Sequence, residues 1–293
     1  MKATLNPADQ VLLCAPFFGS YRDAVLSIGA TTKTLPCHPQ DNFRLTPETL
    51  ENAITDKTRW LLLSLPSNPA GAVYDEAQLQ ALGEVLQNHP QVLLLSDEIY
   101  EHIIFDNRKF ISAAHALPHL ADRILTVNGV SKAYAMTGWR IGYCAGPQAL
   151  IDVMIKVQSQ ISSAPCSIAQ AATVEALNGS QKSVDEFRNA FEHRRNLVVA
   201  KIEKIDGLTL EKPGGAFYDY VDCGNLIGKK TPTGDVLDTD TAFASYLLND
   251  AGVATVPGSA YEMSPYIRLS TANSDENLNQ ALVRIAKAVA AVL

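Results

Sequence analysis

Two cationic side chains eight positions apart, Lys132 and Arg140, point most directly to chemistry in this sequence. A lysine amine whose pKa is lowered by desolvation or by a neighbouring cation can form a Schiff base with an aldehyde. A guanidinium group stays charged and offers a planar fork to phosphate oxygens. The pair therefore predicts a site for a ligand that carries both an aldehyde and a phosphate. The alternative is a surface lysine beside an arginine in a structural ion pair, which a Ser-Lys dipeptide alone would favour.

Four short apolar runs, residues 11–14, 60–65, 92–95 and 123–127, are expected to be the strands that position this chemistry. A run such as 60–65, which is apolar apart from one serine, is typical of a parallel strand covered by helices on both faces. Each run is followed by a side chain able to bind a ligand: Phe18, Asn68, Asp97 and Lys132. Because ligands bind at the carboxyl ends of parallel strands, we expect these four side chains to meet at one edge of a sheet.

The second half of the chain has a different pattern. Helical segments are predicted at 147–161, 168–177 and 184–205, and beyond them short apolar runs at 208–210, 217–221 and 266–270 alternate with helices at 241–251 and 275–292. This order is typical of a small α+β domain. The sequence thus predicts an α/β fold with a parallel-rich sheet covered by helices in residues 1–182, followed by a small α+β domain in residues 183–293.

The composition of the chain indicates which kinds of molecule it binds. The chain has 293 residues, a net charge of −7 and no run rich in lysine or arginine, which argues against nucleic acid or an anionic membrane. Five scattered cysteines without a Cys-x-x-Cys motif indicate neither a disulfide framework nor a zinc site. No apolar stretch approaches the roughly 20 residues of a spanning helix, and the first residues do not read as a leader. We therefore expect small-molecule substrates, no metal and a cytoplasmic location.

The segment from Asn128 to Tyr143 resembles the cofactor-lysine motif of the class I/II aminotransferases of fold type I, the aspartate aminotransferase family. Two further motifs of that family stand in the same order as Asn68-Pro69-Ala70-Gly71 and Asp97-Glu98-Ile99-Tyr100. Either tetrapeptide alone is more often a turn than a site. The resemblance extends from Leu5 to the C-terminal helix and implies that the family's N-terminal segment, including a helix end that cradles phosphate, is lacking here.

The resemblance implies pyridoxal 5'-phosphate as cofactor and assigns a role to each residue. Lys132 would bond to the aldehyde and, as the free amine, move the substrate proton; Asp97 would keep the pyridine nitrogen protonated. Asn68 and Tyr100 would bind the ring oxygen, Phe18 would stack on the ring and Arg140 would bind the phosphate. The catalytic set is then Lys132, Asp97 and Tyr100. For Phe18, a plain core aromatic is an equal alternative.

Arg268 is expected to bind the substrate. It lies in the run 266–270, where an arginine between apolar residues is costly without an anionic partner. The resemblance implies that this partner is the α-carboxylate, with Phe18 and Asn68 also reaching the substrate. A buried structural ion pair is the alternative. Glu98 and His102, which adjoin the Asp97 motif, are interpreted as structural.

The resemblance implies amino-group transfer between an L-amino acid and a 2-oxo acid, carried out by a homodimer. Two alternatives remain open. One is a β-lyase or decarboxylase that uses the same cofactor. The other is a catalytically weak, truncated cofactor-binding module, such as the aminotransferase-like regulatory domains attached to DNA-binding segments, although nothing basic precedes Leu5.

Overall fold

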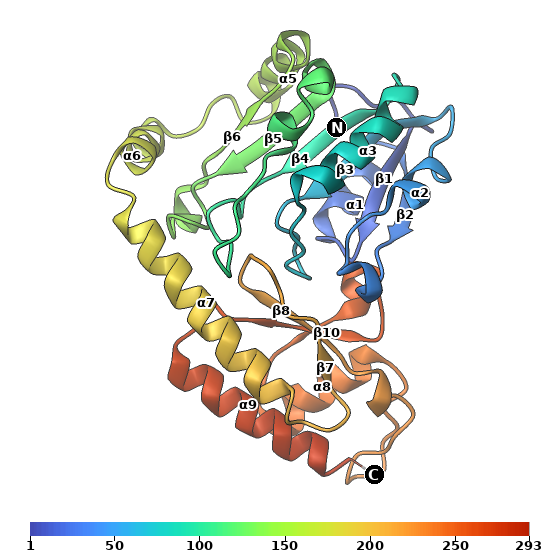
Figure 1. Ribbon diagram of the computed structural model, residues 1–293, viewed down its shortest axis with the longest axis vertical. Coiled ribbons are helices and arrows are strands. Elements are labelled where there is room, and N and C mark those ends of the chain that lie inside the picture. The colour runs from blue at the N-terminus through green and yellow to red at the C-terminus, as the bar shows by residue number, and fades with distance from the viewer. Residues whose placement is uncertain (293) are drawn as a thin grey trace.

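The computed structural model describes residues 1–292, which form two sheets connected by a long helix (Figure 1). The larger sheet has the strand order β2-β1-β3-β4-β5-β6. Its strands β1 to β5 are parallel, and β6 is antiparallel to β5. They are β1 (Gln10–Ala15), β2 (Thr31–Pro36), β3 (Thr58–Ser64), β4 (Leu93–Asp97), β5 (Ile124–Gly129) and β6 (Gly142–Ala145).

The helices that cover this sheet begin where the sequence supplies caps. Thr46 accepts the backbone N–H of Thr49 at the start of α2, and Asp75 forms a reciprocal capping box with Gln78 at the start of α3. Leu79, Leu82 and Leu86 of α3 are buried against the strands. The helices of this half are α1 (Ser20–Leu26), α2 (Pro47–Glu51), α3 (Glu76–Asn88), α4 (Ala113–Ala116), α5 (Gln148–Ile161) and α6 (Ser167–Asn178).

Helix α7 (Lys182–Ile202) runs from the larger sheet to the smaller one (Figure 1). The smaller sheet has the order β7-β8-β10-β9, and its pairs are antiparallel. Its core contains apolar side chains of α7, α8 and α9 together with the strands. The elements are β7 (Thr209–Leu210), β8 (Tyr218–Asp222), α8 (Asp240–Ala251), β9 (Val256–Pro257), β10 (Tyr266–Ser270) and α9 (Asp275–Ala290).

The predicted fold class is confirmed, because a parallel-rich sheet with helices is followed by a small α+β unit. Two strands were not predicted from the sequence. Strand β6 is exposed throughout, so it lacks the apolar run of a buried strand, and β9 has only two residues. The chain reaches β6 through a short 3-10 helix, Thr137–Trp139, instead of a helical crossover, which is why β6 runs antiparallel. Within residues 1–292, no helix combines the length and apolarity required to cross a membrane.

Candidate active site

A cavity of about 430 Å³ opens at the carboxyl ends of β1, β3, β4 and β5, and residues of β8 and β10 form its other wall. All seven residues singled out from the sequence line it: Phe18, Asn68, Asp97, Tyr100, Lys132, Arg140 and Arg268. The expectation that four neighbouring strands bring Phe18, Asn68, Asp97 and Lys132 together therefore agrees with their positions. The resulting site lies between the two sheets.

Asp97 is the last residue of β4 and points its carboxyl group into this cavity. One carboxyl oxygen accepts a 2.6 Å hydrogen bond from the Tyr21 hydroxyl, and the other accepts the backbone N–H of Ile99 at 3.2 Å. Burial raises the pKa of Asp97, whereas the two donors and the nearby Lys132 charge oppose that rise. Asp97 thus combines a desolvated carboxyl group with hydrogen bonds that favour its anion.

Lys132 lies in the turn that follows β5, with its Nζ 6.0 Å from the centre of the Tyr100 ring and 5.9 Å from that of Phe217. Burial lowers the pKa of Lys132, and the charges of Arg140 and Arg268 lower it further, while Asp97 acts in the opposite direction. A lowered pKa increases the fraction of neutral amine, which is the nucleophilic form. Both causes expected from the sequence, desolvation and a neighbouring cation, are present.

The turn between β5 and β6 depends on Gly129, the position three residues before Lys132. A Cβ atom at Gly129 would lie 2.9 Å from the carbonyl oxygen of Ile141 and 3.2 Å from the Cα of Gly142. Arg140 follows with a left-handed backbone, φ 54°, and its guanidinium donates to the carbonyl oxygen of Thr137 at 2.8 Å. Lys132 and Arg140, which both lie in the connection between β5 and β6, both line the cavity.

Arg268 comes from β10 and reaches across to the larger sheet. Its Nη1 donates to the side-chain oxygen of Asn68 at 3.0 Å, and its guanidinium carbon lies 4.3 Å from the ring centre of Tyr218 and 5.1 Å from that of Tyr261. Within residues 1–292 the Nε atom is buried without a hydrogen-bond partner. These contacts are an amide and two rings instead of a carboxylate, which disfavours the structural ion pair and leaves donors for an anion.

Phe18 is exposed rather than packed in the core. Its side chain is 43% exposed and meets the Tyr21 ring edge-on at 5.7 Å, whereas the adjacent Phe17 is 4% exposed. Glu98 is buried and accepts hydrogen bonds from Ser96, Ser112 and the backbone of Ala113, as expected of a structural residue.

Tyr21 and Tyr218 also line the cavity, although the sequence did not single them out. Tyr21 follows Phe18 by three positions on the same turn, a spacing that places both on one side, so this signal was available. The Tyr218 hydroxyl lies 3.2 Å from that of Tyr100, which is 118 positions away in the sequence. No local pattern could have indicated that pair.

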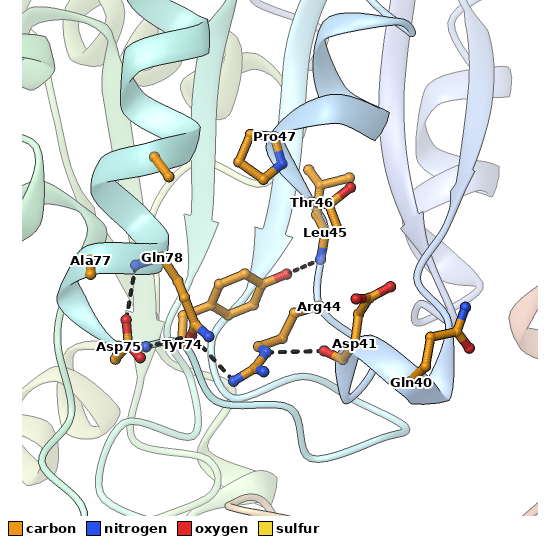
Figure 2. Close-up of a pocket in the computed structure, with 11 residues that line it drawn as sticks. Gln40, Asp41, Arg44, Leu45, Thr46, Pro47, Tyr74, Asp75, Ala77 and Gln78 are labelled. Carbon is orange, nitrogen blue, oxygen red and sulfur yellow. Dashed lines mark hydrogen bonds between the residues drawn. The ribbon is translucent and has the colours of Figure 1, made fainter.

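A second cavity, of about 390 Å³, lies between the start of α3 and the segment before α2 (Figure 2). Its polar groups satisfy one another: Arg44 donates to Gln78 and to the carbonyl oxygen of Asp41, and the Tyr74 hydroxyl accepts the N–H of Leu45. It contains none of the predicted site residues. Within residues 1–292 there is also no cluster of three or more histidine, cysteine, aspartate or glutamate residues suited to a metal ion.

A family model described as aminotransferase class I and II matches residues 1–285. The chain belongs to this family. It is 51% identical over 288 residues to an aspartate aminotransferase of Rhizobium meliloti (strain 1021), covering 98% of this chain and 70% of that relative. It is 50% identical over 283 residues to an aspartate/prephenate aminotransferase of Cereibacter sphaeroides, covering 97% of this chain and 71% of the relative.

Solved structures give the same result. The crystal structure of the aspartate aminotransferase from Rhizobium meliloti matches with a TM-score of 0.97 at 50% sequence identity, covering 99% of this chain and 73% of the other. The Thermus thermophilus aspartate aminotransferase with maleate matches with a TM-score of 0.87 at 38% identity, covering 98% and 72% of the two chains. The chain is accordingly a pyridoxal-phosphate-dependent transaminase that moves an amino group between an amino acid and a 2-oxo acid.

The described residues fit this cofactor. One cavity presents an amine with a lowered pKa for the aldehyde, a carboxyl group for the ring nitrogen, an exposed aromatic ring and a guanidinium group for the phosphate. No other cavity described above combines these groups.

Proposed function

We propose that the cavity between the two sheets is the active site and that its residues have the roles assigned from the sequence. The observation that carries this proposal is that Lys132, with its lowered pKa, shares one cavity with Asp97, Arg140 and Arg268. Pyridoxal phosphate, when bound, supplies an electron sink for the electron pair left on the substrate Cα. The chain itself binds, orients and moves protons around it.

On this proposal, the Lys132 amine would hold the cofactor through its aldehyde and, as the free amine, would take the proton from the substrate Cα. Asp97 would hold a proton on the ring nitrogen, and the hydrogen bonds from Tyr21 and from the backbone of Ile99 favour the Asp97 anion that this role requires. The hydroxyl of Tyr100 and the amide of Asn68 would bind the ring oxygen, the Phe18 ring would stack on the cofactor ring, and Arg140 would bind the phosphate.

We further propose that Arg268 binds the substrate α-carboxylate and that L-aspartate is an amino donor. The unsatisfied, buried Nε of Arg268 supports the first part, because a buried donor without a partner is costly until an acceptor arrives. The relatives' names, aspartate aminotransferase and aspartate/prephenate aminotransferase, support the second. We also propose that the enzyme acts in amino-acid metabolism and that its role there is biosynthetic.

A panel of amino acids tested with 2-oxo acid acceptors checks this assignment. We expect aspartate to give the highest kcat/KM, and Arg268→Lys to raise KM for it by about tenfold or more, because lysine cannot form the bidentate contact. Measuring pyruvate and ammonia release in parallel detects lyase activity. Ammonia release in place of a new amino acid would contradict the proposal.

We also propose that the enzyme is a homodimer and that its domains are residues 1–182 and 183–293. The two sheets, which lie on either side of that boundary, support the division. Exposed apolar side chains on α5 and α6 support the dimer: Ile155, Ile161, Ile168 and Val174. Five free cysteines are consistent with a reducing compartment such as the cytoplasm.

A further inference from the structure

Tyr218 stands between the two halves of the candidate site. Its hydroxyl oxygen lies 3.2 Å from that of Tyr100, and its ring lies 4.3 Å from the guanidinium carbon of Arg268. The side chain is 9% exposed and lines the cavity. One residue of the smaller sheet therefore contacts both the side of the cavity that faces the cofactor and the side that faces the substrate carboxylate.

The backbone fixes Tyr218 in this place. The segment before β8 is hydrogen-bonded to the loop after Tyr100, with the N–H of Ala216 donating to the carbonyl of Ile103 at 2.9 Å and the N–H of Phe105 donating to that of Gly214 at 3.0 Å. A Cβ atom at Gly215 would lie 2.7 Å from the carbonyl oxygen of Ile103, so only glycine allows this approach. Main-chain hydrogen bonds thus join the segment that follows Tyr100 to the segment that precedes Tyr218.

We propose that Tyr218 is a positioning residue that acts through Tyr100 and Arg268: its hydroxyl donates to the Tyr100 oxygen, and its ring holds the Arg268 guanidinium. This inference rests on the proposed function of the site. It concerns a residue outside the set that the sequence indicated, and it makes two separable statements, one for the hydroxyl and one for the ring.

In the hydrogen bond between the two hydroxyl groups, the donor can be inferred from the other partner proposed for Tyr100. Tyr100 is proposed to donate its single proton to the cofactor's ring oxygen, so its contact with Tyr218 can only be made by accepting. A phenol that accepts one hydrogen bond becomes a better donor in the next, because the bonds polarise each other. The opposite direction would turn the Tyr100 proton away from the cavity.

The ring acts on Arg268 by a different force. A guanidinium group over an aromatic face is attracted by the ring quadrupole. The guanidinium carbon of Arg268 lies over the Tyr218 ring and 5.1 Å from the centre of the Tyr261 ring. These rings and the Asn68 amide restrict the guanidinium, so its free donors are held in place before a carboxylate binds.

The test for the hydroxyl is a double-mutant cycle read by spectroscopy. The absorbance band of pyridoxal phosphate bound to the holoenzyme is titrated with pH in the wild type, Tyr100→Phe, Tyr218→Phe and the double variant. A weaker hydrogen bond from Tyr100 to the ring oxygen raises the pH at the midpoint of this absorbance titration. We therefore expect Tyr218→Phe to raise the midpoint by a few tenths of a pH unit, which is less than the rise expected for Tyr100→Phe. In the Tyr100→Phe background, Tyr218→Phe should have no further effect.

The test for the ring compares Tyr218→Phe with Tyr218→Leu. Phenylalanine keeps the ring and should leave KM for the amino acid within about twofold, whereas leucine should raise it about threefold to tenfold. Tyr246→Phe is the control for losing a buried phenol that is hydrogen-bonded outside the cavity, to the carbonyl of Ala288. It should leave both the midpoint and KM as in the wild type, and the apoprotein's affinity for pyridoxal phosphate should not change.

The outcomes separate the two levels of the proposal. Absence of any lysine-dependent band in the wild type would overturn the proposed site itself. A normal wild-type titration with no shift in Tyr218→Phe, or with shifts that add in the double variant, would overturn the role of the Tyr218 hydroxyl alone. Equal KM values for Tyr218→Leu and the wild type would overturn the role of the ring.

Discussion

At the scale of single residues, the carboxyl group of Asp97 is subject to two opposing influences. Burial favours its neutral form, while the hydrogen bonds from Tyr21 and from the backbone of Ile99 favour the anion. In its proposed role of holding a proton on the cofactor's ring nitrogen, Asp97 has to be ionised although it is desolvated. The 2.6 Å hydrogen bond from the Tyr21 hydroxyl therefore stabilises the charge that Asp97 needs for this role, and this effect does not require Tyr21 to contact the substrate.

We predict that Tyr21→Phe raises the pKa of Asp97. The phenol stabilises the anion, so without it Asp97 takes up a proton at a higher pH, and the acidic limit of cofactor binding moves upward by about one pH unit. Fluorescence titration of the apoprotein with pyridoxal phosphate between acidic and neutral pH measures this limit. A Tyr21→Phe limit equal to that of the wild type would show that Tyr21 does not set the Asp97 charge.

Asp97→Asn should behave differently. An amide cannot stabilise a protonated ring nitrogen by charge, so kcat should fall by about a hundredfold or more while Lys132 still bonds to the cofactor. Turnover of the best amino donor and the cofactor absorbance spectrum are measured on the same sample. Retention of near wild-type kcat in Asp97→Asn would remove Asp97 from the catalytic set.

At the scale of the elements, β8 carries a buried acid beside the tyrosine that lines the site. Asp219 is fully buried, and within residues 1–292 neither of its carboxyl oxygens has a hydrogen-bond partner. Desolvation raises its pKa to about 8, against the opposing charge of Arg195. The folded protein therefore keeps Asp219 protonated at a pH at which the unfolded chain releases the proton.

The sign of the stability effect follows from this difference. A folded-state pKa above the unfolded value of 3.8 means that unfolding releases a proton between the two values, so the free energy of unfolding falls as pH rises from about 4 to about 8 and then levels. We predict that Asp219→Val removes this loss, so that the free energy of unfolding of the variant falls less with rising pH over that interval than that of the wild type does. Urea denaturation of both proteins at several pH values measures it; parallel stability curves would contradict the account.

The elements also show what the sequence could and could not predict. Strand β3 could be predicted because most of its residues on both faces are buried, which favours an apolar run such as residues 60–65, interrupted only by Ser64. Strand β4 could be predicted in the same way, although one of its faces is only half-buried. Strand β6 is exposed, so its four residues carry no such pattern. Arg268 could be selected from the sequence because a charged side chain within an apolar strand is costly unless it has a partner. Tyr218 could not be distinguished from the other aromatic residues, because only the fold brings its hydroxyl to that of Tyr100.

At the scale of the whole molecule, ion pairs connect the two halves of the chain, and an exposed apolar face lies on helices α5 and α6. Arg195 of α7 donates to both carboxyl oxygens of Asp106 in the loop after β4, at 2.8 and 3.1 Å, and Lys212 also contacts Asp106 at 3.1 Å. These bonds connect the long helix and the smaller sheet to the larger one. Helices α5 and α6 lie at the periphery of the larger sheet (Figure 1). Helix α5 contains no buried residue, and α6 exposes several apolar side chains.

We predict that this exposed apolar face joins two copies of the chain. Ile168 on α6 is 71% exposed, so Ile168→Glu should place a charge in the interface and convert the dimer to monomer at micromolar concentration. Leu248→Glu is the matched control, because Leu248 on α8 is 54% exposed and lies in the smaller unit. Sedimentation velocity distinguishes the species. A monomeric wild type, or equal dissociation by both variants, would contradict the proposed dimer.

The central claim, that Lys132 is the group that holds the cofactor, has the most direct test. Protein loaded with pyridoxal phosphate is reduced with borohydride, digested and analysed by mass spectrometry, with Lys132→Ala and the exposed-loop variant Lys230→Ala treated in the same way. We predict the reduced cofactor on Lys132 in the wild type and in Lys230→Ala, and none in Lys132→Ala, which should still bind cofactor weakly through Arg140. Label on another lysine, or an unlabelled wild type at saturating cofactor, would contradict the account.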